Sequence, residues 1–141
     1  MTNKDKTVEK KEIIEMLEGA IDYLDQVFLN KELISNAVEE ENYDVAWQEF
    51  DNFISGIETL NQLLYNLKPV LDLDYDKLVY EEKSLNIYIE QFNDFLSNKL
   101  ISAMENKDYI LVADLINHEL QIHLKEYQKV FIYLLNYVVQ A

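Results

Sequence analysis

The sequence has no cysteine, no arginine, only two glycines and only one proline in its 141 residues. Without cysteine the chain can form neither a disulfide nor a thiolate metal site, and it has no cysteine nucleophile. The shortage of glycine and proline disfavours β folds rich in hairpins, and it disfavours glycine-lined phosphate loops. Long helices joined by few short turns are therefore expected.

Positive charge is also scarce, because 27 acidic residues face 12 lysines and the formal net charge is −15. Nucleic-acid binding needs a positive field and usually the two-pronged guanidinium group of arginine. We therefore predict no nucleic-acid partner and no anionic membrane partner. A basic protein partner is compatible with this charge.

Long apolar runs are absent as well. The most apolar stretch, residues 130–139, is about half the length that a bilayer-spanning helix needs. The N-terminus lacks the apolar core of a signal peptide. We expect a cytoplasmic protein with a single helical domain over residues 1–141, in which residues 1–7 are flexible.

Apolar residues recur at helical spacing in four segments, which predicts helices over about residues 8–41, 44–68, 75–105 and 108–140. The second segment is the most regular and steps by 4 and 3 through Ala46, Phe50, Phe53, Ile57, Leu60, Leu64 and Leu67. In the first segment Lys31 interrupts the apolar seam. Because no glycine or proline lies there, we favour one continuous helix.

Short polar segments separate these helices. Residues 41–44 and 105–108 each supply an asparagine that can end a helix in the left-handed conformation and an aspartate that can cap the next helix. Pro69 is expected to end the second helix at Lys68. The two resulting hairpins resemble each other at a spacing near 65 residues. The fold class predicted is all-α, an up-down-up-down four-helix bundle built from two helix hairpins.

The string HELQIH at residues 118–123 resembles the zinc-protease motif but is one residue longer. Zinc proteases place two histidines four residues apart, so that both reach one ion. On a regular helix, His118 and His123 lie roughly 140° apart, and only a π-bulge would bring them together. We expect a half-buried His123 in the core seam, with Glu119 one turn earlier, and His118 near the surface.

No catalytic motif is present, so we predict that the protein is not an enzyme and needs no cofactor. The Glu-x-x-His pairs of di-iron bundles are absent. The three aspartates of residues 72–76 begin like a calcium loop, but the glycine and the final glutamate of that loop are missing. We expect them to cap a helix instead. One alternative stays open, a bundle that binds a metal or small molecule through Glu119 and His123.

The C-terminal segment is apolar on nearly all sides, more than one seam requires. Either this helix is central in the bundle, or it presents a second face to a partner protein or a second copy, as in a homodimer. The candidate interface residues are Phe131, Ile132, Tyr133, Leu135 and Val139.

Two short motifs resemble those of a known group of proteins. Residues 105–109 (ENKDY), followed by Ala113-Asp114 and Glu119-Leu120, resemble an NKDYxxxAD…EL pattern of small uncharacterised helical proteins from low-GC Gram-positive bacteria. Residues 55–57, which contain Gly56, are similar to a stretch of the same proteins. The resemblance implies an all-helical fold and no assigned activity. In size, acidity and helical design, the chain is also similar to flagellar and secretion export chaperones.

These observations together predict a non-enzymatic, cytoplasmic helical bundle that acts as a protein–protein interaction module, such as an adaptor or a chaperone. A groove between helices would take an amphipathic partner helix, or the C-terminal helix would self-associate.

Overall fold

The computed structural model describes the backbone from Asn3 to Ala141 and the side chains from Lys10 onward. Almost every described residue is helical: α1 Asn3–Asn30, α2 Glu32–Glu39, α3 Tyr43–Leu71, α4 Leu85–Phe95, η1 Leu96–Ile101, α5 Ser102–Glu105, α6 Tyr109–Leu115, η2 Ile116–Leu120 and α7 Gln121–Gln140. Two short strands, β1 (Val79–Tyr80) and β2 (Lys83–Ser84), form an antiparallel hairpin.

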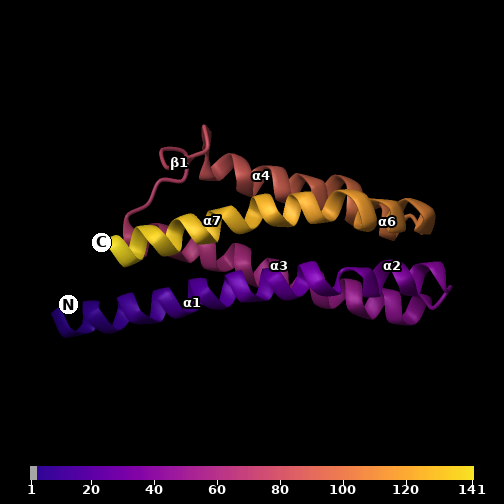
Figure 1. Cartoon of the computed structure of the whole chain (residues 1–141), viewed down its shortest axis with the longest axis horizontal. Coiled ribbons are helices and arrows are strands. Elements are labelled where there is room, and N and C mark those ends of the chain that lie inside the picture. The colour runs from indigo at the N-terminus through magenta and orange to yellow at the C-terminus, as the bar shows by residue number, and fades with distance from the viewer. Residues whose placement is uncertain (1–2) are drawn as a thin grey trace.

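The predicted four-helix bundle is confirmed. Its four rods are α1 with α2, α3, α4 with η1 and α5, and α6 with η2 and α7 (Figure 1). Backbones approach most closely between α1 and α7, α2 and α3, α4 and α7, and α2 and α6. Both ends of the chain and the β hairpin lie at one end of the bundle, and α2 and α6 lie at the other (Figure 1).

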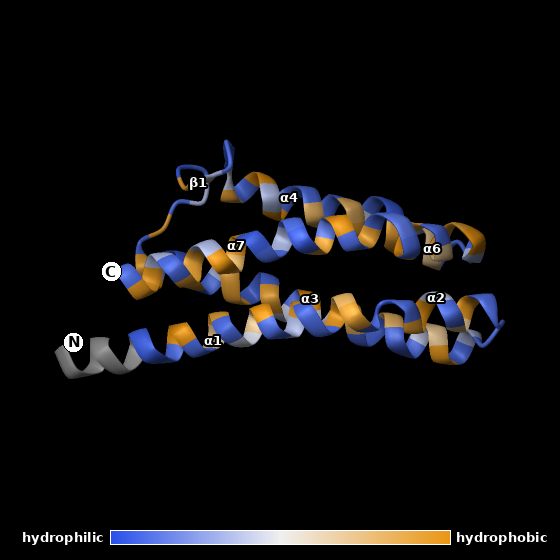
Figure 2. Ribbon diagram, in the orientation of Figure 1, coloured by the Kyte–Doolittle hydropathy of each residue, from blue (hydrophilic) through white to orange (hydrophobic). Residues whose placement is uncertain are grey.

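The predicted apolar seams form the core. All seven seam residues of the second segment are buried, and the buried side chains of all rods form one cluster. Figure 2 shows the same pattern as an alternation of apolar and polar residues along each rod. Burying such seams supplies about 25 cal/mol per Å² of apolar surface and is the main favourable contribution to the assembly of the bundle.

The first rod is broken, which corrects the prediction of one continuous helix. Its regular hydrogen bonding stops at Lys31, although the backbone angles there stay helical and α2 continues in the direction of α1 (Figure 1). Lys31 occupies a buried seam position, and its Nζ atom lies 3.7 Å from the Glu32 carboxylate and 5.7 Å from the centre of the Phe28 ring. The break occurs where a charged residue occupies an apolar seam position and is buried there.

The prediction that Pro69 ends the second helix is wrong, because α3 continues to Leu71. Proline fixes φ at a helical value and removes one N–H donor, which is a small loss in the last turn. The helix ends instead at Asp72, which has a left-handed φ of 52°. The Leu73 N–H then donates to the Lys68 carbonyl at 2.9 Å, a common helix ending.

The third helix begins ten residues later than predicted, because residues 75–84 form a loop and the β hairpin. The Tyr75 hydroxyl donates to the Leu64 carbonyl at 2.6 Å and ties this loop to α3. Ser84, not an aspartate, caps α4 by accepting from the Ile87 N–H. The two turn residues, Glu81 and Glu82, both have positive φ, so this hairpin turn forms without the glycine or asparagine that usually permits it.

Two π-helical segments, η1 and η2, interrupt the second hairpin. A π turn holds one more residue than an α turn and therefore rotates the residues beyond it. After η2 the buried face runs through Leu124, Tyr127, Val130, Phe131, Leu134 and Val138. His123 is half-buried, as expected, and Tyr137 is exposed.

The two helix–helix turns have the same geometry at a constant offset of 66 residues (107 minus 41, 109 minus 43). Glu41 and Lys107 have positive φ values of 60° and 57°. The expectation that asparagine fills this position is therefore wrong, whereas Asp108 does cap α6. The equivalent Tyr43 and Tyr109 stack on each other with centroids 4.2 Å apart, so the two turns meet at this end of the bundle.

A polar network crosses the bundle beside the seams. The amide groups of Asn61 on α3 and Asn93 on α4 donate to each other at 2.7 and 3.3 Å. The Tyr127 hydroxyl on α7 donates to the same Asn61 oxygen at 2.5 Å, and its ring stacks on Phe92. Burial raises the pKa of Tyr127, so the phenol stays a neutral donor and joins three rods.

Candidate binding sites

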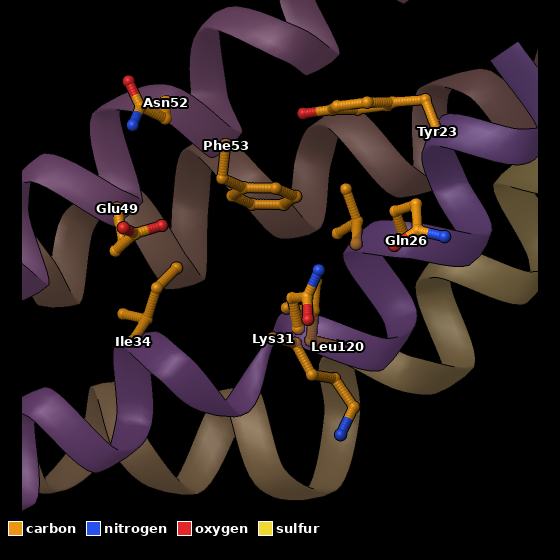
Figure 3. Close-up of a pocket in the computed structure, with 10 residues that line it drawn as sticks. Tyr23, Gln26, Lys31, Ile34, Glu49, Asn52, Phe53 and Leu120 are labelled. Atoms are coloured by element: carbon orange, nitrogen blue, oxygen red, sulfur yellow. The ribbon is translucent and has the colours of Figure 1, made fainter. Parts of the chain in front are cut away.

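A cavity of about 220 Å³ lies beside the break in the first rod (Figure 3). We call it the break cavity. Residues from α1, α2, α3 and η2 line it: Tyr23, Gln26, Val27, Asn30, Lys31, Ile34, Glu49, Asn52, Phe53 and Leu120. Two irregularities therefore meet here, the break at Lys31 and the π turn that ends at Leu120. Regular helices pack ridge into groove, and irregular ones leave such gaps.

Gly56 on α3 positions one wall of the break cavity. A Cβ atom added to Gly56 would overlap the hydroxyl and ring of Tyr23. The missing side chain thus lets the Tyr23 ring lie against α3, next to Phe53 (Figure 3). Desolvation by this burial raises the pKa of Tyr23, so its hydroxyl remains protonated and polar at the edge of the cavity.

The charges around the break cavity are unequal. The Glu49 carboxylate points toward the centre of the cavity, and Glu49 is half-buried (Figure 3). Among the described residues no cationic group lies within 4.0 Å of it. The ammonium of Lys31 points away from Glu49 and pairs with Glu32 (Figure 3). Electrostatically, the cavity favours a cation.

A second hollow of about 470 Å³ runs between α2 and the rod of α6 and η2 at the turn end of the bundle. We call it the end groove. Its apolar side is formed by Val38, Ala113, Ile110 and the stacked pair of Tyr43 and Tyr109. The Trp47 indole N–H donates to the Tyr109 hydroxyl at 3.3 Å and holds this ring in place. The aromatic pair is therefore fixed by its own contacts.

The polar side of the end groove is acidic. Glu39, Glu41 and Asp114 line it together with Asn117 and His118. The Asn117 amide donates to Glu39 at 3.5 Å, and His118 lies 3.7 Å from Asp114. No lysine lines this groove among the described residues.

The two residues proposed for metal or small-molecule binding, Glu119 and His123, each have a contact with another side chain. Glu119 pairs with Lys99 at 3.4 Å, across the two π-helical segments. His123 is half-buried and stacks on Phe95 with centroids 4.1 Å apart, and desolvation lowers its pKa. His118 is exposed and faces Asp114, so η2 does not join the two histidines in one pair. Within the described part of the chain, no three His, Asp or Glu side chains gather as metal ligands.

The proposed C-terminal interface residues divide into three groups. Phe131 is fully buried, which corrects its assignment to an accessible surface, because α7 is the central helix against both α1 and α4. Tyr133 and Leu135 are half-buried against the core, and Tyr80 packs edge-on against Tyr133. Ile132 and Val139 are exposed. Whether these two contact a partner stays a prediction.

Sequence reasoning missed both hollows, since each is lined by residues far apart in the chain. Two signals pointed to the break cavity, the lysine at a seam position and the glycine inside the most regular helix. The motif residues Asp108 and Tyr109 did identify the region of the end groove, although only as part of a turn.

No described helix is apolar enough over a sufficient length to cross a membrane. No curated protein and no solved structure matches the chain significantly. One family model does match, over residues 15–130, which contain every residue that lines the two hollows. This match spans most of the chain and agrees with the expectation of an uncharacterised family. The chain belongs to the family described as Domain of unknown function (DUF8042).

Proposed function

We propose that the protein is a non-enzymatic, cytoplasmic interaction module that docks a lysine- or arginine-rich amphipathic helix of a partner protein in the end groove. The observation that carries this proposal is the exposed apolar platform of the groove beside three carboxylates. An adaptor or an export chaperone would use a groove of this kind.

The apolar half of the groove supports a docking role. Ile110 is 87% exposed, the most exposed of the large apolar side chains with described surroundings, and it stands beside the Tyr43–Tyr109 pair. Burying an isoleucine contributes about 1.5–3 kcal/mol. Rigid aromatic surfaces lose little entropy when a partner covers them, so they often dominate binding energy.

The spacing of the groove residues supports a helical partner. Ile110, Ala113, Asp114 and Asn117 follow each other at helical intervals on the side of α6 and η2 that lines the groove. Ala113 is only 7% exposed and forms part of the floor of the groove. A partner helix placed over it would contact Ile110 and the stacked Tyr43–Tyr109 pair.

The charge supports a basic partner. Carboxylates on both walls, Glu39 and Glu41 on one and Asp114 on the other, would face cationic residues flanking the apolar stripe of the partner. The net charge of −15 would also attract such a helix from a distance and raise its rate of association.

The proposal can be tested with a synthetic amphipathic helix of leucine and lysine, titrated into the isotopically labelled protein and followed by NMR. We expect saturable shifts at Tyr43, Ile110 and Asn117. The double variant Glu39→Lys/Asp114→Lys should weaken binding about tenfold or more. The matched control Glu15→Lys/Glu18→Lys has the same net charge as this double variant. Both of its substituted residues are exposed on α1, outside the groove, so it should bind the helix nearly as well as the wild type does.

Equal loss of affinity in both charge variants would overturn the proposal, since it would show attraction to the overall charge only. Ile110→Ser separates the apolar contribution and should weaken binding with little change in salt dependence. If sedimentation instead shows a homodimer that Ile110→Ser dissociates, the groove is a self-association surface, and the proposal of a basic partner fails.

A further inference from the structure

We infer that the break cavity is a binding site for a small primary amine with an apolar body, whose ammonium group pairs with Glu49. This site is separate from the end groove and does not depend on the proposed docking function.

The size of the cavity limits the ligand. An engineered apolar cavity of about 150 Å³ in another protein holds benzene, so a volume of about 220 Å³ corresponds to roughly nine non-hydrogen atoms. This is smaller than a nucleotide or a typical drug. A phenyl ring or a short branched alkyl chain with an aminoethyl group has this size.

The apolar lining specifies the body of the ligand. Val27, Ile34, Phe53 and Leu120 contribute to the lining from α1, α2, α3 and η2 respectively. The Phe53 ring lies in the middle of the view between Tyr23 and Ile34 (Figure 3). Water forms few hydrogen bonds beside such an apolar surface, so a hydrocarbon group would displace it favourably.

The polar lining specifies the head group. Glu49 is the one carboxylate among the lining residues, and it faces the cavity without a described cationic partner within 4.0 Å. An ammonium ion donates three hydrogen bonds, one for this carboxylate and two for amide oxygens of Asn30, Asn52 or Gln26. A charge-assisted hydrogen bond of this kind is among the stronger contacts in proteins.

Other ligand classes fit less well. Ca²⁺ prefers six or more oxygen ligands with several carboxylates, and a single carboxylate lines this cavity. An anion would be repelled by Glu49 and by the net charge of −15. A neutral ligand would leave Glu49 unpaired in a less hydrated site, which is unfavourable. A monovalent organic cation can pair with Glu49 through its charge and cover the apolar lining with its hydrocarbon body.

Phenethylamine is the probe for this inference, with phenylethanol as its neutral counterpart of about the same size. Titration calorimetry and NMR of the wild-type protein should give saturable binding of phenethylamine, with a Kd of about a millimolar or tighter and shifts at Tyr23, Phe53 and Leu120. Phenylethanol should bind about tenfold more weakly, because it cannot form the ion pair.

Two variants locate the ligand. Glu49→Gln keeps the shape of the side chain and should weaken phenethylamine binding about tenfold without weakening phenylethanol binding. Glu58→Gln is the matched control, because this exposed glutamate is on the same helix outside the cavity, and it should bind like the wild type. Gly56→Ala should weaken both probes, since the new methyl group displaces Tyr23 from the wall.

Three results would overturn the inference: no saturable binding of phenethylamine, equal affinity for the amine and the alcohol, or an equal effect of Glu49→Gln and Glu58→Gln. Unchanged near-ultraviolet circular dichroism of Glu49→Gln would show that the variant is folded, so that a loss of affinity reports on the site. Wild-type affinity for phenethylamine in Ile110→Ser would show that this site acts independently of the end groove.

Discussion

The two hairpins of the bundle share a turn but differ in how their first helices reach it. Both turns have a residue with left-handed φ at the equivalent position, Glu41 in one and Lys107 in the other. By the same offset of 66 residues, Lys31 corresponds to Ser97 in the sequence. At Lys31 the first hairpin has a break, with a cavity beside it. At Ser97 the second hairpin has a π turn, which keeps the helix continuous and leaves Leu100 fully buried. The same point in a hairpin can therefore be accommodated by a break or by a π turn.

This comparison teaches where binding capacity arises in a helical bundle. A π turn absorbs an extra residue through a wider hydrogen-bonded ring, so side chains can close over it. The broken helix instead keeps a charged residue in its seam, where Lys31 is buried and pairs with Glu32. The first hairpin also contains both glycines of the chain, Gly19 and Gly56. The break and both glycines are thus in the first half of the chain, whereas both π turns are in the second half.

The largest predicted difference concerns equivalent core residues, Ile34 in the first hairpin and Leu100 in the second. Leu100→Ala should lower the free energy of unfolding by about 3–4 kcal/mol, as for a fully packed leucine. Ile34→Ala should cost only about 2 kcal/mol, because Ile34 already borders the break cavity and loses fewer contacts. Urea unfolding with an unchanged slope would measure both values. An equal or greater loss for Ile34→Ala would contradict the asymmetry.

A smaller effect tests the shared geometry of the turns. Glu41→Gly and Lys107→Gly should each stabilise the protein by about 0.5–1 kcal/mol, because glycine adopts positive φ without strain. The neighbouring Glu40→Gly and Asn106→Gly should destabilise it by a similar amount, since both residues have negative φ. Thermal or urea unfolding of the four variants should show matching pairs. Opposite signs for Glu41→Gly and Lys107→Gly would disprove the equivalence.

The smallest predicted effect is a pH dependence confined to the second hairpin. Desolvation lowers the pKa of His123 below its ordinary value of 6.5, so the folded state disfavours the protonated ring. Its contribution to stability is fully present above about pH 6.5 and decreases as the pH falls through the unfolded pKa toward the lower folded one. His123→Phe should keep the stacking on Phe95 and flatten the stability profile between about pH 5.5 and 7.5. An unchanged pH profile in His123→Phe would contradict this assignment.

Most of the fold could be predicted from the sequence because periodic seams determine which helix faces are buried. The second segment shows this best, since every residue from Ala46 to Leu67 on its seam is buried. The hairpin of residues 79–84 could not be predicted, because two glutamates occupy turn positions that normally need glycine or asparagine. The π turns could not be predicted either. Beyond η2, Leu124 is buried and His123 is half-buried, and nothing in the local composition indicates this.

The sites were harder to predict than the fold. A buried seam can be predicted from the residue spacing within one helix. A hollow depends on which residues of different rods lie next to each other, and this spacing does not indicate that. Tyr23 and Glu49 have no distinguishing sequence pattern, and only their shared position beside the break gives them a possible role. Ile110 appears in the sequence as an ordinary apolar residue, and only the structure reveals that it is 87% exposed.

The polar network of Asn61, Asn93 and Tyr127 has a consequence for the handedness of the bundle. Two helix hairpins can associate in a left-turning or a right-turning arrangement, and apolar seams alone distinguish these poorly because hydrophobic contacts have no direction. Asn61 lies beside its seam, so it faces Asn93 in only one of the two arrangements. In the mirror arrangement the half-buried amides and the buried phenol would lose these partners, and a buried group left without a partner costs about 1–3 kcal/mol. The network of three side chains thus favours one of the two topologies.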